Sequence, residues 1–102
     1  MSVTCMEENR CLTASLSGEL DHHRAREVME ELDRQIELEL PRQLVVDMGG
    51  VTFMDSSGIA VLLRAYRRMA QLEGSMTVTN VPDQAERVFR AAGLHRIIKF
   101  EA

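Results

Sequence analysis

Residues 44–70 read LVVDMGGVTFMDSSGIAVLLRAYRRMA, and this stretch decides the fold class. Its first five residues, Leu44 to Met48, are too few for a helix and lack the alternation of a half-exposed strand. Such a short apolar run is typical of a strand that is covered on both faces. The pair Gly49-Gly50 that follows is a turn signal, so we expect residues 49–55 to form a loop.

A helix is expected to begin directly after this loop, near Ser56 or Ser57. Apolar side chains recur there every three or four residues, and arginines lie on the opposite side. This spacing predicts an amphipathic helix with one buried face, and Gly74 marks its end. The expected inward-facing residues are Ile59, Leu62, Leu63, Tyr66, Met69 and Ala70.

Upstream of this unit the sequence predicts a hairpin and another helix. Residues 2–7 and 11–16 have strand character, and Gly18 is expected to end the second strand. Asp21 is a natural N-cap because its carboxylate can accept hydrogen bonds from the first helical amides. The expected inward-facing residues of this helix are Ala25, Val28, Met29, Leu32 and Ile36.

Downstream, a strand is predicted over residues 75–79, a third helix from Pro82 to Gly93 and a last strand over residues 97–100. Ala85, Val88, Phe89 and Ala92 are expected to face inward from the third helix. Strands that alternate with helices favour parallel pairing through right-handed crossovers. The sequence therefore predicts an α/β domain whose mixed, mostly parallel sheet carries an N-terminal hairpin and three main helices.

Length and composition exclude several classes of protein. A chain of 102 residues is the size of one domain, and its net charge of −4 has the wrong sign for a general nucleic-acid binder. No apolar run could span a bilayer, and the N-terminus does not resemble a signal peptide. Cys5 and Cys11 lack the companion ligands of a zinc site. We therefore expect free thiols in a cytoplasmic protein that binds no metal, cofactor, nucleic acid or membrane.

The charge is unevenly distributed along the chain. Residues 1–55 hold 5 basic and 12 acidic side chains, whereas residues 56–102 hold 7 and 4. Half of the acidic residues in the first segment, six of the twelve, lie on the first predicted helix, where we expect them to form a solvated face.

The segment Phe53-Met54-Asp55-Ser56-Ser57-Gly58 is the candidate for chemistry. Capping is one explanation, with one serine as the N-cap, the other in the first turn and Asp55 just outside. Capping leaves one hydroxyl spare, and a helix N-terminus favours an added phosphate through its free amides and its dipole. A small hydrolase that uses Ser56 or Ser57 is another alternative. The segment lacks the leading glycine of a nucleophile elbow, and the three histidines are distant from the two serines in the sequence.

Three segments together resemble the STAS family, and within it the sporulation-type anti-sigma F factor antagonists. They are Gly18-Glu19-Leu20-Asp21-His22-His23, the Phe53–Gly58 segment, and Ala92-Gly93-Leu94-His95-Arg96-Ile97-Ile98-Lys99-Phe100. The segments occur in order and with the family's spacing. The resemblance implies one STAS domain over residues 1–102 that binds a partner and is not an enzyme.

The resemblance also implies a partner-switching function. Such a protein, when unphosphorylated, binds an anti-sigma factor that is also an ATP-dependent serine kinase, and the sigma factor is thereby released. The kinase phosphorylates the first serine of the Asp-Ser-Ser-Gly motif, which is Ser56 here, and a metal-dependent phosphatase of the PP2C type removes the phosphate. An antagonist in a general-stress or other signalling pathway, with the same phosphoserine switch, is the alternative within the family.

The residues expected to contact the partner are Asp21, Ser56, Ser57 and Gly58, which match the family's motifs, together with His22 and Asp55 at the same two strand-to-helix junctions. Phosphate on Ser56 would add negative charge to a surface that already carries Asp21 and Asp55. Like-charge crowding and desolvation of the phosphate would then oppose docking.

Overall fold

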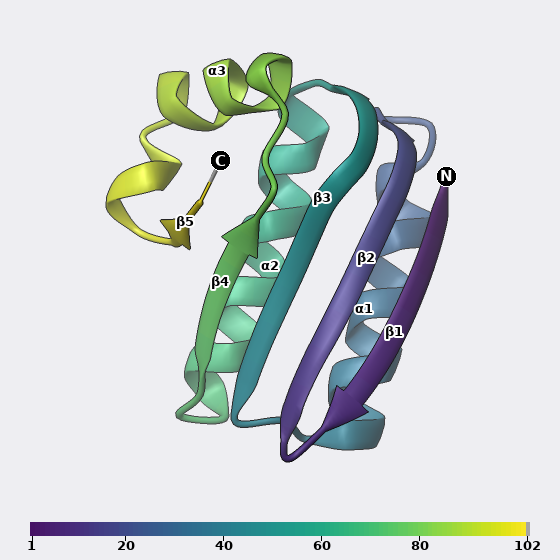
Figure 1. Cartoon of the computed structure of the whole chain (residues 1–102), viewed down its shortest axis with the longest axis vertical. Helices are drawn as coiled ribbons and strands as arrows, with labels where there is room; N and C mark the ends of the chain where they lie inside the picture. The colour runs from purple at the N-terminus through teal and green to yellow at the C-terminus, as the bar shows by residue number, and fades with distance from the viewer. Residues whose placement is uncertain (102) are drawn as a thin grey trace.

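The element order predicted from the sequence is confirmed in the computed structural model, which describes residues 1–101. One sheet has the strand order β1-β2-β3-β4-β5, in which β1 and β2 pair antiparallel and the other neighbours pair parallel. The predicted mixed α/β domain with an N-terminal hairpin and three helices is therefore confirmed (Figure 1). Ala102, the last residue of the expected domain, lies outside the described residues. The strands are β1 (Ser2–Glu8), β2 (Cys11–Leu20), β3 (Gln43–Met54), β4 (Ser75–Thr79) and β5 (Lys99–Phe100), and the helices are α1 (Ala25–Glu39), α2 (Ser56–Gln71), α3 (Asp83–Ala91) and a short 3₁₀ helix η1 (Leu94–Arg96).

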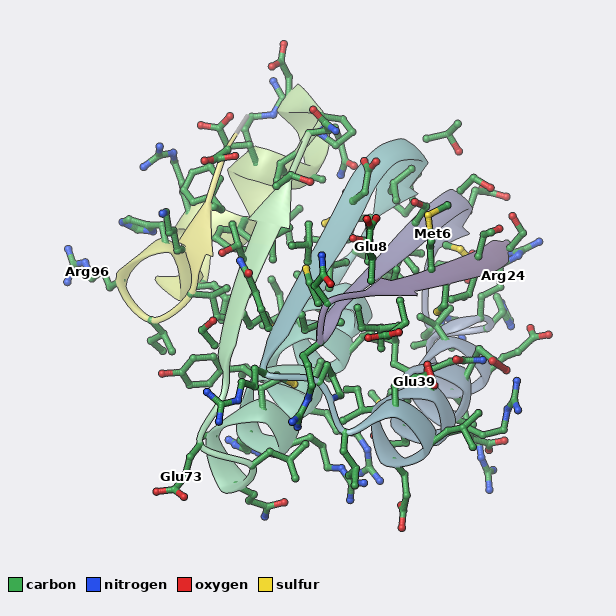
Figure 2. The ribbon with its side chains drawn as sticks, turned by 60° about the horizontal axis from the view of Figure 1, so that its bottom comes forward. Met6, Glu8, Arg24, Glu39, Glu73 and Arg96 are labelled. Atoms are coloured by element: carbon green, nitrogen blue, oxygen red, sulfur yellow. The ribbon has the colours of Figure 1, made fainter. Side chains whose placement is uncertain are left out.

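The core lies between one face of the sheet and the helices α1 and α2, which lie side by side in Figure 1, and it extends to Ala85 and Phe89 of α3. On β3, Leu44, Val46 and Met48 are buried against these helices, whereas Val45 and Asp47 on the other face are half-buried. The expectation that this strand is covered on both faces is therefore wrong. Successive right-handed crossovers in a sheet with sequential strand order place their helices on the same side. Figure 2 shows Met6 and Glu8 of β1 on the opposite face of the sheet.

Two glycine segments that predicted breaks lie inside strands instead. Gly18, at φ +103°, is followed by an irregularity in the β2–β3 register, and β2 continues to Leu20. Gly49-Gly50 also lies within β3, and a Cβ on Gly50 would come within 2.6 Å of the Ser17 Cβ. The register also shifts between Ser15 and Ser17, and at each of the two shifts β3 holds one residue more than β2, as in a β-bulge, while the pairing continues. The predicted loop over residues 49–55 is thus a strand as far as Met54.

Element ends and the outermost inward positions differ from the prediction. Helix α1 begins at Ala25, and Asp21 lies in the turn before it. Ala70 and Ala92 are exposed. Ala70 lies about 100° around α2 from the buried Met69, and Ala92 follows the last residue of α3. The last strand, β5, is two residues long, because η1 occupies the preceding segment.

The uneven charge of the chain is partly neutralised between α1 and α2. Arg64 of α2 lies 2.8 Å from the Asp33 carboxylate of α1, and Arg68 lies 3.1 Å from that of Glu37. The outer face of α1 is therefore only partly a solvated acidic face, since arginines from the second half of the chain pair with it. Exposed pairs of this kind contribute at most about 1 kcal/mol each.

Candidate functional site

The predicted site residues come from two strand ends that lie side by side. Leu20 pairs with Met54 in the β2–β3 register, and the Asp55 amide donates to the Leu20 carbonyl at 3.3 Å. Asp21 therefore follows one strand at the point where Asp55 follows its neighbour. The two β-bulges make this possible, because both strands run on past their glycines to finish together. Ligands and partners of open α/β sheets bind at this carboxyl end.

Asp55, and not a serine, is the N-cap of α2. Its carboxylate oxygen Oδ1 accepts from the Ser57 amide at 2.8 Å, and its carbonyl accepts from the Gly58 amide at 3.0 Å. This corrects the expectation that one of the two serines caps the helix. Ser56 is the first helical residue and is exposed, whereas Ser57 is half-buried.

This cap changes what a phosphate on Ser56 would meet. The amides of Ser57 and Gly58 already donate to Asp55, so the first turn does not offer them to an added anion. A phosphate there would keep the favourable helix dipole but would lie beside the Asp55 carboxylate. It would therefore project from the surface and add to the negative charge there.

Gly58 is buried and contributes to the site by packing. A Cβ at this position would lie 2.5 Å from the Met54 Cγ, 2.7 Å from the Met54 Sδ and 3.2 Å from the Leu20 Cδ2. Real Cβ atoms do not approach other atoms this closely, so only glycine lets the start of α2 rest on both strand ends. This contact holds the Asp55–Ser56 segment against the end of the sheet.

Asp21 organises the turn between β2 and α1. Its Oδ1 accepts from the amides of His23 and Arg24 at 3.1 and 3.2 Å, and its Oδ2 accepts from the Arg24 guanidinium at 3.0 Å. Desolvation raises the pKa of Asp21, but the Arg24 charge and the three hydrogen bonds together outweigh it, so the pKa lies below its usual value. His22 is exposed beside this turn, and its ring lies 4.0 Å from that of His23.

Three further side chains at this end of the sheet were not among the predicted contact residues. Glu19 pairs with Phe53 in the strand register, and both are exposed, Phe53 to 42%. Gln84 of α3 bonds the backbone of Met54. Phe53 could have been recognised as a contact residue, because it is an aromatic residue close to the two serines. Nothing in the sequence connects Gln84 with Met54, which lies 30 positions away.

The histidines do not form hydrogen bonds to the serine hydroxyls. Among residues 1–101, no hydrogen bond joins Ser56 or Ser57 to His22, His23 or His95. His95 lies in η1, and its buried Nδ1 has no hydrogen-bond partner in the part of the chain that the structure describes. The arrangement needed by the hydrolase alternative, a base within hydrogen-bond reach of the nucleophile, is not observed.

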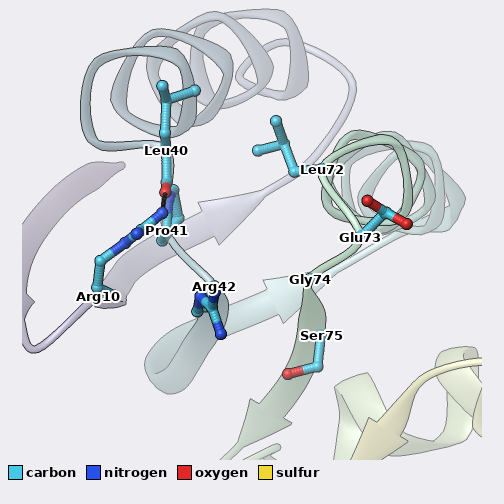
Figure 3. Close-up of a pocket in the computed structure, with 8 residues that line it drawn as sticks. All are labelled: Arg10, Leu40, Pro41, Arg42, Leu72, Glu73, Gly74 and Ser75. Carbon is cyan, nitrogen blue, oxygen red and sulfur yellow. Dashed lines mark hydrogen bonds between the residues drawn. The ribbon is translucent and has the colours of Figure 1, made fainter.

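A hollow of about 750 Å³ lies at the opposite end of the sheet, where β3 and β4 begin. Figure 3 shows the Arg10 side chain at the Leu40 carbonyl, to which it donates at 3.0 Å. The hollow is lined by Arg10, Leu40, Pro41, Arg42, Leu72, Glu73, Gly74 and Ser75. Ser56 follows the far end of β3, so this hollow is separate from the candidate site.

Comparison with known proteins gives one family and several relatives. The family model described as "STAS domain" matches residues 3–102. An anti-sigma F factor antagonist of Paenibacillus polymyxa is 36% identical over 94 residues, which cover 91% of this chain and 80% of that protein. An anti-sigma-B factor antagonist of Listeria monocytogenes is 28% identical over 86 residues, covering 84% and 75%.

Solved structures of the anti-sigma factor antagonist SpoIIAA share the fold at 22% identity. The unphosphorylated form superposes with a TM-score of 0.83, covering 99% of this chain and 89% of that one. The phosphorylated form, from Bacillus, superposes with a TM-score of 0.74, covering 99% and 92%. Within residues 1–101, no helix is both long enough and apolar enough to cross a membrane.

Proposed function

This chain belongs to the STAS domain family, and on that premise we propose that it is an anti-sigma factor antagonist whose docking is switched off by phosphate on Ser56. The unphosphorylated form binds an anti-sigma factor that is also a serine kinase, and a phosphatase of the PP2C type restores that form. The relatives named anti-sigma factor antagonists support the first half of the proposal. The proposal includes a cytoplasmic location, because the kinase that it invokes uses ATP.

The observation that carries the proposal is the different exposure of two adjacent serines. Ser56 is exposed, while Ser57 is half-buried and its amide is bonded to the Asp55 cap. A kinase can therefore reach the Ser56 hydroxyl without opening the helix start. Phosphate at this position changes the surface and leaves the buried contacts of α2 in place.

The switch is electrostatic and steric. The unphosphorylated docking surface consists of Glu19, Asp21, Phe53, Asp55 and Ser56, which lie on two adjoining strand ends and the first residue of α2. Arg24 lies 3.8 Å from the Glu19 carboxylate and 3.0 Å from that of Asp21, so it neutralises part of this acidic surface. The exposed aromatic ring and the remaining negative charge suit a partner that offers an apolar contact and basic side chains. A phosphate adds about −1.5 to −2 charges and must lose its hydration for the partner to dock. A tenfold loss of affinity requires only about 1.4 kcal/mol.

We further propose a sigma F type of pathway. The Paenibacillus antagonist of that type is 36% identical to this chain, against 28% for the Listeria sigma-B antagonist. A general-stress pathway with the same phosphoserine switch is the second candidate, because both kinds of antagonist are relatives. Competition between a sigma F type and a sigma-B type anti-sigma factor for the purified protein distinguishes them.

The phosphorylation site is tested with the cognate kinase and ATP. We expect the wild type and Ser57→Ala to gain one phosphate and Ser56→Ala to gain none, as measured by intact mass. The neighbouring serine is a matched control, because it has the same chemistry one residue away. Phosphate on the Ser56→Ala variant would show that the site assignment is wrong.

The effect on docking is tested by calorimetry with the same anti-sigma factor. Ser56→Ala should bind like the wild type, while Ser56→Asp and the phosphorylated protein should bind at least about tenfold more weakly. Equal affinities of the alanine and aspartate variants, together with full affinity of the phosphorylated protein, would refute the electrostatic switch.

A further inference from the structure

Strand β3 extends beyond its neighbour β4. The two strands pair from Gln43–Ser75 to Asp47–Thr79, and β3 then continues to Met54 while the other chain segment turns away towards α3. Figure 1 shows α3 at the end of the sheet where β3 finishes. The last part of β3 is therefore paired with β2 on one side, and on its other side it faces the first turn of α3.

Gln84 provides the hydrogen bonds that a neighbouring strand would otherwise make. The Met54 amide donates to the Gln84 Oε1 at 2.8 Å, and the Gln84 Nε2 donates to the Met54 carbonyl at 2.8 Å. The Gln84 carboxamide presents an N–H donor and a carbonyl acceptor side by side, which matches the N–H and C=O that a single strand residue such as Met54 presents at one edge of the strand. Glutamate would lose the donor, and asparagine is one methylene shorter. The half-buried Gln84 side chain therefore fits the backbone of Met54 specifically.

The Met54 backbone leads directly into the helix cap. Asp55 follows it, bonds to Leu20 through its amide and holds the Ser57 amide through its carboxylate. The junction is thus held from β2 on one side and from α3 on the other. The segment between these two attachments presents the Ser56 hydroxyl.

We propose that Gln84 is a positioning residue for Ser56, an inference that rests on the proposed phosphorylation of that serine. It fixes the Met54 backbone so that the Asp55 cap and the Ser56 hydroxyl keep one orientation. Without it, the two Met54 backbone groups turn to water and the junction takes several orientations. The kinase must then order the junction when it docks, which weakens docking but leaves the transfer step unchanged.

The first test measures amide hydrogen exchange by NMR in the free protein. Gln84→Ala should accelerate exchange about tenfold at Ser57 and Gly58, as well as at Met54, relative to the amide of the buried Val61 further along α2. Arg87→Ala is the matched control, since Arg87 is exposed on the same helix, and it should leave these ratios unchanged. Faster exchange at Met54 alone would overturn the inference, because the cap would then not depend on Gln84.

The second test measures phosphorylation kinetics with the cognate kinase. Gln84→Ala should raise KM about tenfold and change kcat less than about twofold, whereas Arg87→Ala should change neither. Gln84→Glu, which keeps the size of the side chain and one acceptor, should also raise KM. An unchanged KM in both Gln84 variants would overturn the inference.

These results separate the inference from the proposed function. Absence of Ser56 phosphorylation in the wild type would refute the proposed function, while the exchange ratios would still decide whether Gln84 holds the cap. If a urea titration shows that Gln84→Ala is already unfolded without denaturant, amide exchange and phosphorylation kinetics are both measured on Gln84→Glu instead.

Discussion

Replacing Gly58 by alanine should destabilise the protein, because the start of α2 rests on two fully buried side chains. The added Cβ would lie 2.5 Å from the Met54 Cγ and 3.2 Å from the Leu20 Cδ2. Met54 and Leu20 both have 0% exposure. Cγ is near the backbone, so it can move away only if the whole Met54 side chain changes its rotamer inside the core.

The size of the effect follows from two opposing contributions. Overpacking of a filled core costs about 1–3 kcal/mol. Alanine regains up to about 1 kcal/mol through its higher helix propensity, and less in a first turn. We therefore expect a net loss of about 1–2 kcal/mol in the free energy of unfolding. For a domain of this size such a loss lowers Tm by about 5–15 °C.

Urea unfolding of a double-mutant cycle tests the reasoning. Gly58→Ala should lower the transition midpoint in the wild-type background. In a Met54→Ala background the same substitution should be neutral or stabilising, because the atoms that block the new Cβ are absent. A Gly58→Ala protein as stable as the wild type would refute the close contact, and so would an equal loss in both backgrounds.

Three further perturbations concern the cap, the turn before α1 and the thiol of β1. Asp55→Ala removes the acceptor of the Ser57 amide and should cost about 0.5–2 kcal/mol in urea unfolding, whereas Asp55→Asn should cost less. Arg24→Gln should raise the pKa of Asp21 towards its usual value of about 3.9, as followed by NMR titration of the carboxyl carbon, and an unchanged midpoint would contradict the role of that ion pair. Since the folded pKa of Asp21 is the lower one, the stability it contributes is present above the unfolded pKa and is lost as pH falls through the folded value. Burial, followed by the Glu31 charge, raises the pKa of the Cys5 thiol, so its alkylation should reach half-maximal rate at a higher pH in the folded protein than in urea. The same midpoint in both states would contradict that shift.

The parts of the fold that could be predicted are those determined by local pattern. The apolar spacing of α1 and α2 depends only on which residues face the core, and it located both helices. Strand ends depend on the neighbouring strand, which a local sequence pattern does not include. The sequence alone therefore predicts breaks at Gly18 and Gly49-Gly50, where the strands in fact continue. A glycine signals a backbone change, but whether the chain turns or forms a bulge depends on the register opposite it.

The site was predicted in part for the same reason. Parallel strands bring Asp21 and Asp55 to one end of the sheet, and this follows from the element order. Asp55 is the cap because the carbonyl of Leu20 holds its amide at the end of β3, which no local pattern specifies. Gln84 lies in the first turn of a helix, where a polar residue is ordinary, so its bonds to Met54 could not be recognised without the tertiary structure.

The cap also determines how a phosphate on Ser56 can act. If a serine had been the N-cap, its phosphorylation would have replaced the capping hydroxyl and destabilised the start of the helix by about 0.5–2 kcal/mol. Because Asp55 fills that role, none of the hydrogen bonds that hold the start of α2 within residues 1–101 involves the Ser56 hydroxyl, and its modification leaves them intact. The added charge then acts on whatever docks against the strand ends, where Glu19, Asp21 and Asp55 already gather. A switch built in this way can be reset without refolding, since removal of the phosphate restores the same surface on the same framework.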